Sequence, residues 1–254
     1  MSESSSVLEA GSVQSEVRDG VATVRFAHPK GNSLPGALLG KLADAISAAG
    51  RDPAARVIVL RSEGEGPFCA GASFDEFKAI ESAEQGRRFF SGFAKVVLAI
   101  IRAPGFVVTR VQGKTAGGGI GIIAASDYAL ATEAASLRLS ELAVGIGPFV
   151  VGPVIERKLG LAAFSALAVD ADWRSSSWAR ERGLYAEVLP GIPELDTRLD
   201  QFAARLAGYN PEAVRRMKEI LWRGTEDWES LLAERAGISG QLVLSDYTRK
   251  AIDR

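Results

Sequence analysis

The chain has 254 residues, of which 47% are hydrophobic and 24% charged, as is typical of a globular protein with a full core. Its 30 Lys and Arg residues nearly balance 31 Asp and Glu residues, so the net charge of -1 indicates neither nucleic acid nor a membrane as a partner. The one cysteine, Cys69, excludes an internal disulfide, and the one histidine, His28, excludes a His-rich metal site. A Ser-His-Asp triad would need His28 as its base.

The first six residues contain neither the basic region nor the apolar run of a secretory signal. No apolar run along the sequence is long enough to cross a bilayer. We therefore expect a cytoplasmic protein with a short disordered leader over residues 1–12.

Strand and helix patterns alternate through the first part of the chain, which is typical of a layered α/β fold. The continuous apolar run at 57–61 predicts a strand that is covered on both faces. In chain order the predicted elements are a strand at 21–26, a helix at 35–49, a strand at 57–61, a helix at 83–101, a strand at 106–111, a helix ending near 126 and a strand at 128–131.

The pattern becomes helical after Leu189-Pro190. Helical spacing of apolar residues predicts helices at 193–207, 211–222 and roughly 226–250. Asn210 followed by Pro211 is a strong signal for a helix start. We expect this helical region, residues 191–254, to pack on the core or to mediate contacts between subunits.

Two glycine-rich segments are candidates for ligand binding. The first is Phe68-Cys-Ala-Gly-Ala-Ser-Phe74, and the second, 111–121, contains three successive glycines after a predicted strand and before a predicted helix. Glycine in such a run has an entropic cost, which is offset where the backbone must approach a ligand or another chain closely. Free amides at a helix start also favour negative charge.

Neither nucleotide-binding motif fits the second segment. Gly113-Lys114-Thr115 resembles the end of a phosphate loop, but Val108 stands where its first glycine is required. A dinucleotide fingerprint beginning at Gly117 would need glycine in place of Ile122. Close packing of helix on strand by small residues stays open for the second segment alone.

Taken together, the motifs resemble the crotonase (enoyl-CoA hydratase/isomerase) superfamily, nearest to its methylglutaconyl-CoA hydratase-like members. Their order and spacing carry the resemblance, which is close over about residues 15–190. The matching segments are Pro29-Lys-Gly-Asn-Ser-Leu34, Phe68-Cys-Ala-Gly-Ala72, Gln112-Gly-Lys-Thr-Ala-Gly-Gly-Gly119, Asp127, Leu139-Ser-Glu-Leu-Ala-Val-Gly-Ile146 and Trp178-Ala-Arg-Glu-Arg-Gly-Leu184.

The resemblance implies a spiral of ββα units over residues 13–190 that binds acyl-CoA, and a C-terminal region that forms a homotrimer or a dimer of trimers. It implies an acyl-CoA substrate, with no cofactor beyond the coenzyme A of that substrate and no metal. The amides of Ala72 and Gly118 would form an oxyanion hole for the thioester enolate. The residues implied to bind substrate are Ala70, Ser73, Gly117, Asn32 and Ser33.

Common enoyl-CoA hydratases carry two catalytic carboxylates, whereas methylglutaconyl-CoA hydratase-like members have a single catalytic Glu, and the resemblance implies that this chain also carries one. The first belongs two residues after the glycine triplet, where this chain has Gly121. The second belongs four residues before Gly145, which makes Glu141 the candidate general acid/base. Ser73 also departs from the pattern, because many relatives carry Asp there.

Other polar residues are expected to have lesser roles. We expect Asp127 to be structural, Cys69 to be a buried core residue and His28 to lie near the coenzyme A entrance or in solvent. Arg87 and Arg88 would reach a substrate carboxylate only if their helix turned them toward the acyl group, and a solvated helix face is the favoured interpretation.

The leading hypothesis is an acyl-CoA lyase that hydrates an enoyl-CoA or dehydrates a 3-hydroxyacyl-CoA, with a branched, methylglutaconyl-like acyl group as one option. Three alternatives stay open. They are an enoyl-CoA delta-isomerase that uses the same Glu141, a decarboxylase or dehydratase of polyketide β-branching, and a non-catalytic acyl-CoA-binding protein.

Overall fold

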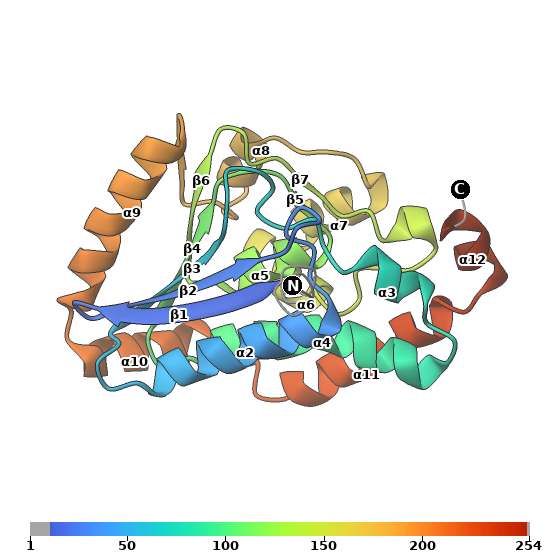
Figure 1. The fold of residues 1–254 in the computed structure, drawn as a ribbon, viewed down its shortest axis with the longest axis horizontal. Coiled ribbons are helices and arrows are strands. Elements are labelled where there is room, and N and C mark those ends of the chain that lie inside the picture. The colour runs from blue at the N-terminus through green and yellow to red at the C-terminus, as the bar shows by residue number, and fades with distance from the viewer. Residues whose placement is uncertain (1–10, 253–254) are drawn as a thin grey trace, which may run out of the picture.

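A twisted six-stranded sheet, in the order β1-β2-β3-β4-β6-β8, forms the centre of the computed structural model, which describes residues 11–252 (Figure 1). Its strands are β1 (Ser12–Arg18), β2 (Val21–Ala27), β3 (Val57–Ser62), β4 (Phe106–Val111), β6 (Tyr128–Thr132) and β8 (Glu187–Leu189). All neighbouring pairs are parallel except β1 with β2. Two short strands, β5 (Thr115–Ala116) and β7 (Leu137–Arg138), form a second parallel pair.

Helices connect the strands and then cover the sheet. Those of the core are α2 (Gly36–Arg51), α3 (Phe74–Lys78), α4 (Ala83–Arg102), α5 (Gly118–Ala125), the 3-10 turn η1 (Leu142–Val144), α6 (Gly152–Leu159), α7 (Leu161–Asp170) and α8 (Ser176–Glu181). The C-terminal helices are α9 (Ile192–Ala207), α10 (Pro211–Leu221), α11 (Trp228–Leu242) and α12 (Asp246–Ile252). The mixed α/β fold confirms the predicted α/β class.

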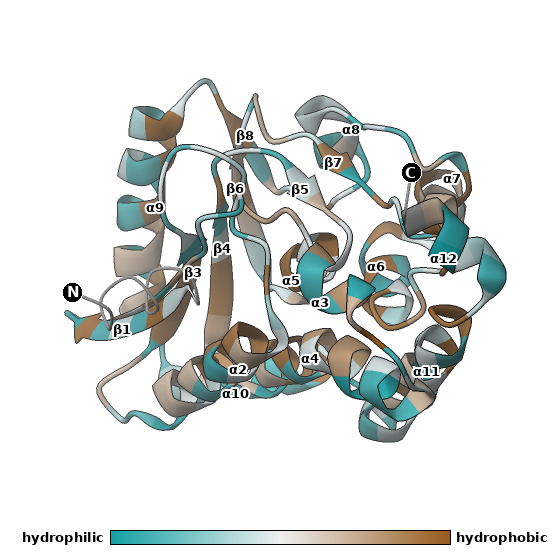
Figure 2. Cartoon of the chain, turned by 45° about the vertical axis from the view of Figure 1, so that its right-hand side comes forward, coloured by the Kyte–Doolittle hydropathy of each residue, from teal (hydrophilic) through white to brown (hydrophobic). Residues whose placement is uncertain are grey.

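The two faces of the sheet bury different apolar clusters. On one face, Val59, Val108 and Leu130 pack against the inward side of α9, which carries Leu199 and Phe202. The other face packs against α2, α4 and α5 in one large core. Figure 2 shows α9 on one side of the strands and α5 on the other. Burial on both faces explains the continuous apolar run of β3.

Strand β1 was not predicted, because most of its side chains are exposed and no alternating apolar pattern marks it. A two-residue turn, Asp19-Gly20, joins it to β2, and both residues have positive φ, at 50° and 81°. Asp-Gly suits such a hairpin turn, since its backbone requires left-handed conformations. Most of the predicted leader, residues 1–10, lies outside the described residues, while its last residue, Ser12, begins β1.

A buried ion pair fastens α10 to the core. Lys218 Nζ donates to Asp127 Oδ2 at 2.7 Å and to the carbonyl oxygens of Ile100 and Gly105. Asp127 also accepts hydrogen bonds from Trp222 Nε1 at 3.0 Å and from the Val107 amide at 2.7 Å. The predicted structural role of Asp127 is therefore confirmed.

The last predicted helix, at 226–250, is wrong in one respect, because the chain forms α11 and α12 with a break between them. Ser245 causes the new start: its Oγ accepts a hydrogen bond from the Thr248 amide at 3.3 Å, as an N-cap does. Within residues 11–252, no helix combines the length and the apolar character that a bilayer crossing requires.

Candidate active site

Two glycine turns place two free backbone amides at one cavity. Gly71 has φ 92° and precedes Ala72, and Gly117 has φ 51° and precedes Gly118. These left-handed conformations suit glycine and turn the following amide out of regular pairing. The neighbouring amides are occupied, because Ser73 N donates to the Leu34 carbonyl and Gly117 N to the Arg138 carbonyl. In residues 11–252, the Ala72 and Gly118 amides have no intramolecular acceptor.

Each glycine of the triplet has its own physical reason. Gly117 is required by its backbone conformation. A Cβ on Gly118 would meet the Phe93 ring at 2.4 Å, and a Cβ on Gly119 would meet Cys69 Cβ at 2.8 Å. Gly118 is the first residue of α5, so the helix dipole adds to the attraction of its amide for negative charge.

Glu141 reaches the same cavity from the segment before η1. Its Oε1 lies against Gly117, where an added Cβ would stand 3.2 Å from it. Its Oε2 is buried and has no hydrogen-bond partner in the described chain. Burial in these surroundings raises the pKa of Glu141 to about 7, from an ordinary value of 4.5. The carboxyl is therefore suited both to take and to give a proton near neutral pH.

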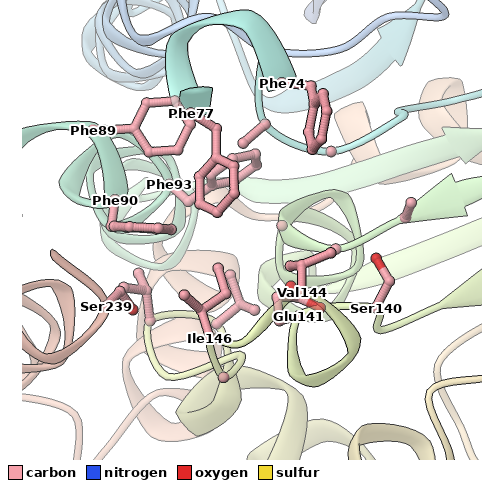
Figure 3. Close-up of a pocket in the computed structure, with 18 of the residues that line it drawn as sticks. Phe74, Phe77, Phe89, Phe90, Phe93, Ser140, Glu141, Val144, Ile146 and Ser239 are labelled. Carbon is pink, nitrogen blue, oxygen red and sulfur yellow. The ribbon is translucent and has the colours of Figure 1, made fainter. Parts of the chain in front are cut away.

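The cavity that holds these groups has a volume of about 180 Å³ and a largely apolar wall. In Figure 3 the Phe77, Phe89, Phe90 and Phe93 rings lie on one side, facing Glu141, Val144 and Ile146 on the other. Ser140 and Ser239 supply the other polar side chains of its lining among the described residues. An apolar wall lowers the local dielectric constant, which strengthens electrostatic interactions inside the cavity.

The structure shows what occupies the place of the missing carboxylate. Gly121 lies in α5, and a Cβ added to it would meet Val151 Cγ1 at 2.4 Å. Val151 itself lines the cavity. A valine side chain thus fills the space that a carboxylate at position 121 would need.

The predicted site residues separate into two groups. Ala70, Ala72, Gly117, Gly118 and Glu141 all line the cavity. The other three, described next, do not.

Ser73, Asn32 and Ser33 are buried beside the cavity without lining it. Ser73 caps α3, since its Oγ accepts from the Glu76 amide. Asn32 Nδ2 donates to the carbonyl oxygens of Glu63 and Pro67, which ties its turn to the segment before Ala70. In the described structure these side chains shape the loops that border the site.

His28 and Cys69 are both buried. The expectation that His28 is exposed or at the coenzyme A entrance is wrong on exposure, because only 8% of the residue is accessible and its Nδ1 lies 3.0 Å from Ser33 Oγ. Burial raises the pKa of the Cys69 thiol to about 12, so this cysteine stays protonated and is a core residue, as predicted.

The aromatic wall was not predicted from the sequence as a set of named residues. Phe93 stands one turn after the adjacent Phe89 and Phe90 on α4, a spacing that also describes an ordinary core helix. Phe77 comes from α3, and Ser239 comes from α11 in the C-terminal helical region. Their meeting depends on how α3, α4 and α11 pack.

The sequence model of the enoyl-CoA hydratase/isomerase family matches residues 16–246. A relative named "(7aS)-7a-methyl-1,5-dioxo-2,3,5,6,7,7a-hexahydro-1H-indene-carboxyl-CoA hydrolase" in Rhodococcus jostii is 30% identical over 80% of this chain and 77% of its own length. The mitochondrial methylglutaconyl-CoA hydratase of Rattus norvegicus is 31% identical over 77% of this chain and 63% of its own. The chain therefore belongs to the enoyl-CoA hydratase/isomerase family.

The fold agrees with this assignment. A crystal structure of an enoyl-CoA hydratase from Bacillus halodurans superposes with a TM-score of 0.88, at 21% identity over 95% of this chain and 98% of that one. The crotonase-like fold and an enzymatic role within the family are thus confirmed, and the particular reaction is taken up next.

Proposed function

We propose that the chain is an acyl-CoA lyase that hydrates an enoyl-CoA, or dehydrates the 3-hydroxyacyl-CoA, with Glu141 as its general acid/base. The observation that carries the proposal is one buried carboxyl, with a pKa near neutrality, in the same cavity as two unpaired backbone amides. The family match and a hydratase among the relatives support it.

In this mechanism the thioester oxygen accepts hydrogen bonds from the Ala72 and Gly118 amides. Glu141 takes a proton from water while the water oxygen bonds to Cβ, and the alkene electrons move onto the thioester as an enolate. The enolate then takes the proton from Glu141 at Cα, which restores the carboxylate. Amides preset for the enolate oxygen stabilise the charge without reorganisation, and each is worth roughly 3–4 kcal/mol in comparable sites.

The water needs an orienting group, because no second carboxylate stands at Gly121. We assign this role to Ser140, whose side chain lines the cavity next to Glu141 (Figure 3). Its hydroxyl both donates and accepts, so it can hold a water without changing charge.

An enoyl-CoA delta-isomerase is the second candidate. Val151 fills the space of the missing carboxylate, so Glu141 is the one candidate base in the described cavity lining and its surroundings are mostly apolar. A single carboxylate is sufficient to move a proton between C2 and C4 of an enoyl thioester. Absorbance of the conjugated enoyl thioester separates the two reactions: a lyase consumes it from a C2 alkene, and an isomerase forms it from a C3 alkene.

We extend the proposal to assembly and location. The acyl-CoA site lies in the spiral core, residues 13–190, and the helical region 191–254 joins subunits into a homotrimer or a dimer of trimers in the cytoplasm. Exposed apolar side chains on α10, namely Met217, Ile220 and Leu221, support a role in contacts between subunits. The proposed reaction requires no cofactor besides the thioester itself.

Substitution of the base tests the proposal. Glu141→Gln keeps the shape of the side chain and removes its proton transfer, so we expect kcat to fall by about 10²–10⁴-fold. Affinity for an unreactive acyl-CoA, measured by calorimetry, should stay within a few fold. Glu133→Gln is the matched control, since Glu133 is exposed and outside the cavity. Full activity in Glu141→Gln would show that this residue is not the general acid/base. If the unsubstituted chain binds acyl-CoA but turns over none of the substrates, it is a non-catalytic acyl-CoA-binding protein.

A further inference from the structure

We infer that the acyl cavity selects an uncharged acyl group that ends in an aromatic ring and rejects acyl groups that carry a carboxylate. The inference rests on the proposed acyl-CoA site and names the substrate class of that site. It narrows the sequence-based option of a methylglutaconyl-like substrate, because a methylglutaconyl group has a carboxylate at its far end.

The first support is the aromatic wall. Phe89 and Phe90 meet edge to face with ring centroids 5.1 Å apart, and Phe77 meets Phe90 at 6.2 Å and 82°. These are the arrangements that aromatic rings prefer among themselves. Phe90 is partly exposed although it is surrounded by apolar residues, and it lines the cavity with Phe93 beside it. The aromatic ring of a substrate could therefore pack edge to face or offset-stacked against these phenylalanine rings.

The second support is size. An apolar cavity of roughly 150 Å³ is known to hold a benzene ring. The cavity here has a volume of about 180 Å³, so it has room for a ring-sized group. Figure 3 shows Ser239 at the end of the cavity away from Ser140, where α11 closes it.

The third support is charge. No Lys, Arg or His side chain lines the cavity among the described residues. Of the cations on the neighbouring helices, Arg87 pairs with Glu84 and Arg249 donates to the Lys78 and Ile80 carbonyls. Lys78 lies over the Phe74 ring, and Arg88 lines a separate groove on the other side of Phe89. A substrate carboxylate would therefore lose its hydration without a partner.

Glu141 increases that cost. Of the residues that the structure describes, it is the one carboxyl in the cavity lining, and it lies in an apolar wall that already disfavours its own charge. A second negative charge in the same small cavity would oppose its ionisation further. A carboxylated acyl group would thus weaken binding and also hinder the base.

Binding of saturated, unreactive thioesters tests the inference independently of turnover. We expect 3-phenylpropionyl-CoA to bind at least about tenfold more tightly than butyryl-CoA, and glutaryl-CoA at least about tenfold more weakly than butyryl-CoA. Glutaryl-CoA binding as tightly as 3-phenylpropionyl-CoA would overturn the inference. Dehydration of the matching 3-hydroxyacyl-CoA thioesters is measured in parallel. Ring-selective binding without turnover would support the inference about the acyl group and contradict the lyase proposal.

A pair of variants connects the preference to the wall. Phe90→Leu removes a ring and keeps apolar bulk, so it should lower the affinity for 3-phenylpropionyl-CoA by about 3- to 10-fold and lower the affinity for butyryl-CoA by less. Phe202→Leu is the control, since Phe202 packs on Tyr128 in the separate α9 cluster. If Phe90→Leu lowers the affinities for both ligands equally and leaves the thermal unfolding curve unchanged, the wall does not select for an aromatic ring. A similar loss in Phe202→Leu would assign the effect to stability.

Discussion

The protonation of Glu141 is the feature of the site most accessible to measurement. Burial raises the pKa of this carboxyl to about 7, and the proposed lyase starts each cycle with the ionised form and restores it. We therefore expect kcat/KM to rise tenfold per pH unit below about pH 7 and to level above it. Rates measured between pH 5 and 9 in buffers of constant ionic strength check this. A bell-shaped profile would require a second titrating group, and a midpoint near 4.5 would contradict the burial of the base.

Among single residues, the sequence predicted those that belong to a recognisable motif. It did not predict the residues of the aromatic wall, which only the packing of the helices brings together. The structure places Ala72, Gly118 and Glu141 at one cavity, as their motif positions predict. Asn32 and Ser33 belong to a matching motif too, yet their side chains are used within the loop. A motif indicates that a position is important for the site. The hydrogen bonds of the folded loop decide whether its side chain contacts the substrate or only holds the loop in place.

At the scale of elements, α5 and the segment before α6 form the part of the site that differs from the two-carboxylate pattern. Alanine at Gly121 would bring Cβ to 2.4 Å from Val151 Cγ1, an overpacking that costs about 1–3 kcal/mol, against a helix propensity gain of about 1 kcal/mol. Replacing Val151 by alanine removes Cγ1 but leaves Val151 Cβ 2.7 Å from the added Cβ, so it relieves the overpacking only in part.

The contact predicts a non-additive pair of substitutions. The double variant Gly121→Ala/Val151→Ala should be more stable, by about 1 kcal/mol, than the summed effects of the two single substitutions predict, as measured by urea unfolding. Gly40→Ala is the control for helix propensity, because a Cβ there meets nothing within 4 Å. Additive effects of the two substitutions would show that Val151 moves freely and does not define the space beside Gly121.

Elements with a buried stripe were predicted within about two residues, whereas those without one were not. Strand β4 matches its predicted range, and α2, α4 and α9 have strong apolar faces. Strand β1 is exposed at an edge and α8 is short, so neither has an apolar period that is long enough to recognise. Their positions come from pairing and capping: Asp19-Gly20 turns the chain at β1, and Ser175 caps α8.

At the scale of the whole molecule, the C-terminal helices take part in both the fold and the site. Helix α11 packs along α4 so closely that a Cβ on Gly240 would meet the Arg87 amide at 2.5 Å, and the neighbouring Ser239 lines the cavity. Helix α10 is held by Lys218, whose side chain is 3% exposed and bonds to Asp127, 5% exposed. The sequence predicted these helices. It did not predict the ion pair of Lys218 with Asp127, because that contact depends on how α10 packs on the core.

This anchor makes the stability of the chain depend on a pair of charges far from the cavity. Lys218→Met should cost about 3–5 kcal/mol, because it leaves the Asp127 carboxylate buried without its cation. The double variant Lys218→Met/Asp127→Asn should recover part of that loss, since it removes the buried carboxylate charge together with its cation. Urea unfolding measures both, and activity of the folded fraction should be unchanged because neither residue lines the cavity. If Lys218→Met costs less than about 1 kcal/mol, water reaches Asp127 and α10 is held mainly by its apolar contacts.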